Sequence, residues 1–305
     1  MDINCKKKLA AKLSIISNIL LTILKITTGL ISGSLSIISE AIHSMSDFFA
    51  SVITFFSVVK SSEPADNDHP YGHGKYEDMS GLIEGFLIIL AAIFIIYHSV
   101  KKIISGSYTN TETGLGITVM FIAALVNFVV SQILFKTAKE SNSISLYADG
   151  QHLRTDVYSS LGVFAGLILI KLSGYSVLDP IIAIIVAGYI YKTGYSISKQ
   201  AIMRLLDYSL PKEDIEKIKK IVKNYSPAVK LKRNGIKARQ VGPTKDIDLI
   251  LQFPENTTIC KCHQLCDTIE KHIQEIYINS SISIHSEPLC YKKNCQKTCD
   301  KNFAN

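Results

Sequence analysis

Long apolar stretches separated by short polar connections fill about the first two thirds of the chain. Six of them reach the roughly 20 residues that a helix needs to cross a bilayer. They span about residues 9–31, 36–60, 79–104, 113–139, 146–172 and 176–203. Residues 1–206 are therefore predicted to form a transmembrane domain of six helices.

The pattern becomes polar and more finely alternating after residue 206. The segments that follow are, in order, a helix at about 211–224, strands at 229–241 and 246–253, a helix at 258–278 and a strand at 281–285. The order αββαβ predicts a small two-layer α+β domain over residues 207–290. A Cys- and Lys-rich tail without periodicity occupies residues 291–305.

Composition agrees with a membrane protein, since 47% of the 305 residues are hydrophobic and only 19% are charged. The net charge of +7 does not indicate a nucleic-acid partner, because no Lys/Arg cluster is interleaved with aromatic residues. The first apolar stretch has no small-residue cleavage site, so it is expected to remain as a membrane anchor.

Basic residues distribute unevenly between the two sides of the six-helix arrangement. One side would hold Lys6, Lys7, Lys8, Lys60, Lys75, Lys136, Lys139, Lys199 and Arg204, and the other only Lys101, Lys102 and Lys171. The positive-inside rule then predicts a multi-pass protein of the plasma (inner) membrane with both termini in the cytoplasm.

Two of the predicted helices repeat the motif His-x-x-x-Asp, as His43 with Asp47 and His152 with Asp156. Ionisable residues within a membrane helix cost roughly 2.5–3.5 kcal/mol each, so each needs a partner or a function. A spacing of four places both side chains of a pair on one helix face. Two such helices packed face to face would offer two imidazoles and two carboxylates, a set that suits a tetrahedral ion such as Zn²⁺.

A purely structural interpretation is that these residues hold the bundle together by hydrogen bonds. A lone intramembrane histidine would favour that interpretation, but two matched pairs favour a metal site. Glu40 and Asp149 precede the two histidines by one turn on the same faces. They are predicted to support the ligands or to line the ion pathway, with a structural role as the alternative.

Several motifs in order make the chain resemble the cation diffusion facilitator family. They are residues 33–47, 66–75, 148–156, 178–180 and 239–243. The resemblance implies a homodimeric antiporter of divalent metal ions and protons in the lipid bilayer, with a cytoplasmic domain similar to metallochaperones. It assigns His43, Asp47, His152 and Asp156 to the transport site, and a His at position 43 is typical of zinc-preferring members.

The predicted function is export of divalent transition-metal cations in exchange for protons, with Zn²⁺ as the first candidate and Cd²⁺, Co²⁺, Fe²⁺ and Mn²⁺ as alternatives. The metal would be the substrate and a regulator, not a catalytic cofactor. An intramembrane metalloenzyme is disfavoured because four protein ligands leave no open position for water and no His-Glu-x-x-His motif occurs. A non-transporting metal sensor is the other alternative.

A second candidate site is the loop that follows the second predicted helix. Asp66, His69 and His73 lie among prolines and glycines, where a non-helical backbone can bring spaced ligands together. The resemblance supports a second metal ion here, and Asp68 or Glu77 could replace one ligand. The alternative is a turn with solvated polar residues.

The resemblance also implies an ion pair between Lys75 and Asp207. In the cytoplasmic domain many relatives bind two metal ions through histidines on the strands, but the segments at 229–241 and 246–253 contain none. The remaining candidates are His263, His285 and Glu287, together with Cys260, Cys262 and Cys266, whose spacing matches no standard zinc finger. Cys290, Cys295 and Cys299 are weaker candidates, and the alternative for the cysteines is that they are buried or reduced surface thiols without a metal.

Overall fold

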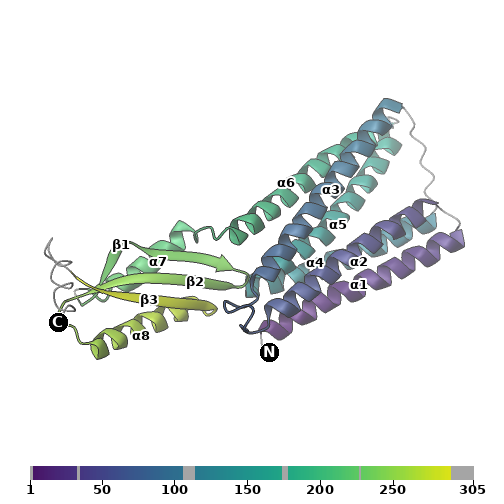
Figure 1. Cartoon of the computed structure of the whole chain (residues 1–305). Helices are drawn as coiled ribbons and strands as arrows, with labels where there is room; N and C mark the ends of the chain where they lie inside the picture. The colour runs from purple at the N-terminus through teal and green to yellow at the C-terminus, as the bar shows by residue number, and fades with distance from the viewer. Residues whose placement is uncertain (1–2, 33–34, 106–113, 174–177, 227, 290–305) are drawn as a thin grey trace. The chain divides into compact units, whose positions relative to one another are not determined.

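The computed structural model describes residues 3–32, 35–105, 114–173, 178–226 and 228–289 (Figure 1). The chain divides into two compact units, Met1–Leu206 and Asp207–Asn305. The first is helical and the second combines helices with a sheet. An α-helical membrane domain followed by a small α+β domain is the predicted fold class, and it is confirmed.

Six long helices make up the first unit, as predicted. They are α1 (Ile3–Ser32), α2 (Leu35–Ser61), α3 (Lys75–Ser105), α4 (Gly114–Ser141), α5 (Ile144–Ser173) and α6 (Leu178–Leu205). The described parts of α1, α3, α4 and α6 are long and apolar enough to cross a membrane, whereas α2 and α5 include side chains outside the described set. Helix α1 begins at Ile3, before the predicted apolar stretch at about residues 9–31, and this first part of the helix carries the buried Lys7, which pairs with Glu77 of α3.

Within this unit α3 packs along α6, α1 along α2 and α4 along α5. The α3–α6 contact depends on small residues that let the backbones approach. A Cβ atom built on Gly85 would lie 2.5 Å from Ser198 Oγ, and one on Gly194 would lie 2.9 Å from the Gly85 carbonyl oxygen. This is the close approach that small residues permit between membrane helices.

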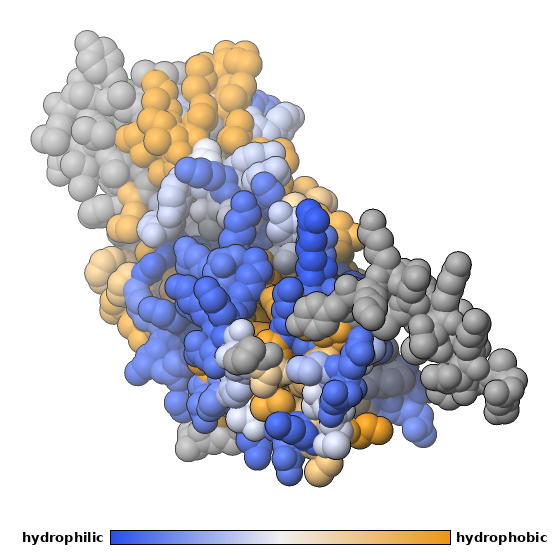
Figure 2. Space-filling view, turned by 90° about the vertical axis from the view of Figure 1, so that its left-hand side faces the viewer, coloured by the Kyte–Doolittle hydropathy of each residue, from blue (hydrophilic) through white to orange (hydrophobic). Residues whose placement is uncertain are grey.

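Large apolar side chains cover the outside of these helices. Phe94 of α3, Phe121 of α4 and Ile185 of α6 are all strongly exposed. Figure 2 shows hydrophobic residues gathered on the long helices, while hydrophilic residues cover much of the C-terminal unit. An apolar exterior of this extent is expected of helices whose solvent is lipid.

The second unit contains α7 (Lys212–Lys223), β1 (Lys230–Val241), β2 (Thr244–Phe253), α8 (Ile259–Ile276) and β3 (Ser280–Pro288). The three strands form one sheet in the order β1-β2-β3, with β1 antiparallel and β3 parallel to β2. Gly242 adopts a positive φ of 53° in the tight turn between β1 and β2, a conformation that glycine accepts without strain. The predicted αββαβ order is confirmed.

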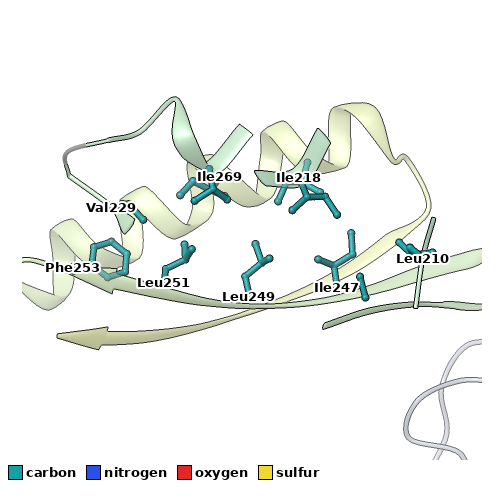
Figure 3. Packing of buried hydrophobic residues seen from close by; sticks show 11 residues of the cluster. Leu210, Ile218, Val229, Ile247, Leu249, Leu251, Phe253 and Ile269 are labelled. Atoms are coloured by element: carbon teal, nitrogen blue, oxygen red, sulfur yellow. The ribbon is translucent and has the colours of Figure 1, made fainter. Parts of the chain in front are cut away.

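The core of this unit lies between the helices and one face of the sheet. Alternate residues of the central strand, Ile247, Leu249, Leu251 and Phe253, all point to this face (Figure 3). They meet Ile218 and Val222 of α7 and Ile269 and Ile273 of α8. The period of two in β2 and the apolar stripes of both helices therefore build a single core.

Candidate metal centre

Three of the four predicted transport-site residues come together between α2 and α5. Asp47, His152 and Asp156 each offer a ligand atom, and these atoms all lie within 4.8 Å of one another. The Nε2 atom of His152 lies 3.0 Å from Oδ1 of Asp47, and both side chains are buried. The spacing of four within α5 places His152 and Asp156 on one face, as the motif requires. The side chain of His43 lies outside the described residues.

Helix α1 supports the α2 side of this site through polar side chains. Asn18 donates to the backbone carbonyl of Asp47 at 3.4 Å, and Thr22 donates to that of Ser44 at 3.2 Å. The buried Lys25 donates to the hydroxyl of Ser44 at 2.7 Å. These bonds fix the segment of α2 that carries Asp47, and hydrogen bonds behind a metal ligand hold it in the orientation that binding requires.

Two further carboxyl groups lie near the site in the interior of the bundle. Asp149 of α5 is buried one turn before His152 and interacts electrostatically with His152 and Asp47. Glu84 of α3 is fully buried, interacts with Asp149 and His152, and accepts a hydrogen bond from Thr54 of α2. The sequence reasoning missed Glu84, although a single carboxylate in an apolar stretch was the signal that could have found it. The side chain of Glu40 lies outside the described residues.

The loop between α2 and α3 forms the second group of ligands. Ligand atoms of Asp66, His69 and His73 all lie within 4.8 Å of one another, and the two imidazole centroids are 4.6 Å apart. His73 is buried, and its Nε2 lies 3.2 Å from Asp66 Oδ2, yet neither ring nitrogen makes a hydrogen bond of normal geometry. A buried, unsatisfied imidazole beside a carboxylate is an arrangement that a metal ion would complete.

Asp66 is held in its ionised form by the loop backbone. The backbone N–H of His69 donates to Asp66 Oδ1 at 2.6 Å and that of Asp68 at 3.1 Å. The His69 bond is the main reason that the pKa of Asp66 lies below its ordinary value, and both histidines add to the effect. A charged carboxylate at this position suits a divalent cation.

Glu77, the alternative loop ligand, is engaged elsewhere. It is fully buried and accepts hydrogen bonds from Lys7 of α1, Ser61 of α2 at 2.6 Å and Ser143, which precedes α5. Its carboxylate therefore joins four segments of the bundle. In this arrangement the loop site consists of Asp66 and the two histidines.

The candidate ligands of the cytoplasmic domain are spread over the two faces of its sheet. His263 of α8 is exposed and lies 3.5 Å from Asp267, while Glu287 of β3 lies 2.7 Å from the ammonium group of Lys232. His285 of β3 is exposed, 3.9 Å from Glu287. Within the described part of the chain these residues form no group of three ligands with metal spacing. The lysine beside Glu287 also opposes a divalent cation there.

The cysteines separate into an exposed residue and a partly buried pair. Cys260 is exposed, whereas Cys262 and Cys266 pack against the core one turn apart, and Cys266 Sγ lies 3.5 Å from Ser286 Oγ. Burial is the main cause that raises the pKa of the Cys266 thiol, with the neighbouring Cys262 adding to it. Cys290, Cys295 and Cys299 lie outside the described residues.

The predicted Lys75–Asp207 ion pair would lie between the two units, and it stays a prediction. Lys75 begins α3 in the first unit. Asp207 begins the second, where its carboxylate lies 3.0 Å from Arg239 Nη1.

Each of the two units matches a known protein-family domain. Residues 11–206 match the cation efflux transmembrane domain, and residues 210–289 match the cation efflux protein cytoplasmic domain. The chain belongs to the cation diffusion facilitator family. It is a membrane transporter of metal cations and not an enzyme, so membership sets aside the metalloenzyme and sensor alternatives.

Relatives of this cation efflux protein align along nearly their whole length. An uncharacterized transporter of Synechocystis is 34% identical, with 87% of this chain and 85% of the relative covered. The cation-efflux pump FieF of Shewanella oneidensis is 27% identical, with 92% and 94% covered. The manganese efflux system protein MneP of Bacillus subtilis is 28% identical, with 91% and 95% covered.

Proposed function

We propose that this transporter exports divalent transition-metal cations, Zn²⁺ foremost, from the cytoplasm in exchange for protons. The observation that carries the proposal is the convergence of Asp47, His152 and Asp156 in the interior of the bundle. We assign His43, which precedes Asp47 by one turn of α2, as the fourth ligand. Two imidazoles and two carboxylates suit Zn²⁺, and the same set accepts Mn²⁺, Fe²⁺, Co²⁺ and Cd²⁺.

Proton exchange follows from the contact between His152 and Asp47. Their Nε2 and Oδ1 atoms are 3.0 Å apart, so a proton lies between them in the metal-free site. Both atoms can bind a metal ion only after that proton has left, because a ligand needs its lone pair. We infer that the imidazole of His152 carries both of its protons in the metal-free site, so that metal entry expels one of them, and a proton that arrives from the outer side promotes metal release. Reorientation of the bundle between the two openings completes the cycle.

The remaining assignments concern regulation and topology. We assign Asp66, His69 and His73 to a second metal site, where a bound ion would tie the exposed loop to the start of α3. We place the protein in the plasma (inner) membrane as a homodimer with both termini in the cytoplasm. The match of residues 210–289 to the family's cytoplasmic domain supports that side for the C-terminal unit.

Reconstituted vesicles with a transmembrane pH gradient test this proposal. Uptake of Zn²⁺, Mn²⁺, Fe²⁺, Co²⁺ and Cd²⁺ would be measured for the wild type and for Asp156→Ala. We expect Zn²⁺ uptake that depends on the gradient in the wild type, and a loss of at least tenfold in the variant because one ligand is missing.

Glu140→Gln is the matched control, since Glu140 is an exposed carboxylate at the end of α4 that pairs with Lys6. It should transport like the wild type. Equal uptake by Asp156→Ala and the wild type would refute the site, and uptake that ignores the pH gradient would refute proton exchange. If the wild type takes up Mn²⁺ faster than Zn²⁺, the proposal that Zn²⁺ is the main substrate would be replaced by Mn²⁺.

A further inference from the structure

Glu84 of α3 is a carboxyl group buried in the interior of the helical unit. It is fully buried, and its Oε1 accepts a hydrogen bond from Thr54 Oγ1 of α2. Its second oxygen, Oε2, is buried and makes no hydrogen bond of normal geometry. On α6, the residue packed against the neighbouring Gly85 is the uncharged Ser198. Glu84 therefore has one satisfied oxygen and one available oxygen.

Asp149 of α5 interacts electrostatically with Glu84 and is equally enclosed. It is 1% exposed, and neither of its carboxylate oxygens makes a hydrogen bond of normal geometry. Ser14 of α1 lies beside it, with a fully buried hydroxyl that is also unsatisfied by normal geometry. Three helices thus direct unsatisfied polar atoms into the same interior region.

Among the described residues, the charges around Glu84 do not balance an ionised Glu84–Asp149 pair. Asp149 is of like charge, and His152, whose charge favours an ionised Glu84, is shared with Asp47 and Asp156. An ionised carboxylate without a partner is very costly in a low-dielectric interior, and such a group holds a proton instead. Because Oε1 already accepts a hydrogen bond from Thr54, the proton belongs on Oε2.

We propose that Glu84 carries a proton on Oε2 in the metal-free transporter and releases it when a divalent cation occupies the Asp47–His152–Asp156 site. The O–H bond of the carboxyl group breaks, its electron pair stays on Oε2, and the proton passes to water. The inference rests on the proposed function, because the cation at that site supplies the driving field. A double positive charge in the interior favours a nearby carboxylate.

The same coupling operates in reverse. If bound metal promotes loss of the Glu84 proton, a proton returning to Glu84 weakens metal binding by the same free energy. Glu84 would then add a second proton-carrying position to the one between His152 and Asp47. It would do so without coordinating the metal.

Proton counting at pH 7 tests this role. Zn²⁺ binding to the detergent-solubilised full chain would be measured by calorimetry in two buffers of different ionisation enthalpy, which gives the protons released per ion. Glutamine has the shape of a neutral glutamic acid, so Glu84→Gln is expected to fold and to bind Zn²⁺ while releasing about one proton fewer. Glu140→Gln should release as many protons as the wild type.

The outcomes separate the two proposals. An unchanged proton count in Glu84→Gln would overturn the role of Glu84, and so would loss of Zn²⁺ binding in a folded variant, which would make Glu84 a ligand. Absence of Zn²⁺ binding by the wild type would instead overturn the proposed function. Infrared difference spectra of the wild type need no variant: added Zn²⁺ should remove the band of a protonated carboxyl group, and a constant band would refute the proposal.

Discussion

Replacing Glu77 should destabilise the helical unit more than replacing any exposed carboxylate. Glu77 is 0% exposed and Lys7 is 1% exposed, and their ion pair links α3 to α1. Ser61 and Ser143 donate to the same carboxylate. In Glu77→Gln the ammonium group of Lys7 would stay buried without a counter-charge, and both hydroxyls would face a neutral amide.

The magnitude follows from comparing buried and exposed pairs. Removing one partner of a buried ion pair costs about 3–5 kcal/mol, because the other charge is left uncompensated. The Lys6–Glu140 pair, whose side chains are 43% and 38% exposed, should contribute about 0–1 kcal/mol. Typical stabilities are about 5–15 kcal/mol, so the loss in Glu77→Gln would be a large share of the total.

Unfolding of the detergent-solubilised protein, followed by circular dichroism, measures both effects. Glu77→Gln should unfold well before the wild type, and Glu140→Gln should unfold with it. The double variant Lys7→Met, Glu77→Leu should recover much of the loss, because apolar residues can replace a buried pair without leaving a charge behind. Equal stability of Glu77→Gln and Glu140→Gln would refute the reasoning.

Three further predictions concern other parts of the chain. Gly85→Ala should lower the free energy of unfolding by about 1–3 kcal/mol through strain, because its Cβ would meet Ser198. Gly188→Ala should leave thermal unfolding unchanged, since nothing lies within 4 Å of a Cβ there. A thiol reagent should modify Cys260 faster than Cys266, because Cys260 is exposed and burial raises the pKa of the Cys266 thiol; equal rates would contradict this. Burial raises the pKa of Asp214, but hydrogen bonds from Lys245 and Tyr277 outweigh this effect, so the pKa lies below its ordinary value. The ionised Asp214 therefore stabilises the folded unit above about pH 4, and this contribution is lost as the pH falls below that value. Asp214→Asn should make the measured free energy of unfolding fall less steeply with decreasing pH in the acid range.

Much of the fold was predictable because its patterns are strong. Six apolar stretches long enough to span a bilayer can form little else, and the alternation at Ile247, Leu249 and Leu251 identifies a strand with one buried face. Helix ends were harder to place. The apolar span at about residues 9–31 did not show that α1 extends back to Ile3, because Lys7 looks like a solvated charge until its partner Glu77 on α3 is known.

The site was predictable within single helices but not between them. The spacing of four identifies His152 and Asp156 as neighbours, and the repeated motif points to α2 as the second element. Nothing in the local sequence, however, shows that Glu84 approaches α5 or that Glu77 turns away from the loop site. Those relations depend on how α3 packs against its neighbours.

The partners of the buried carboxylates indicate which of these groups serve structure and which can exchange protons. Each carboxylate in the interior needs compensation, and the structure supplies a different hydrogen-bonding or charged partner to each: Lys7 to Glu77, His152 to Asp47, and the hydroxyl of Thr54 to Glu84. A lysine partner gives a permanent pair that holds helices together, whereas an imidazole or a hydroxyl leaves the carboxyl group able to exchange its proton. Glu77 is therefore suited to structure, and Asp47 and Glu84 to groups that change charge as the cation arrives and leaves.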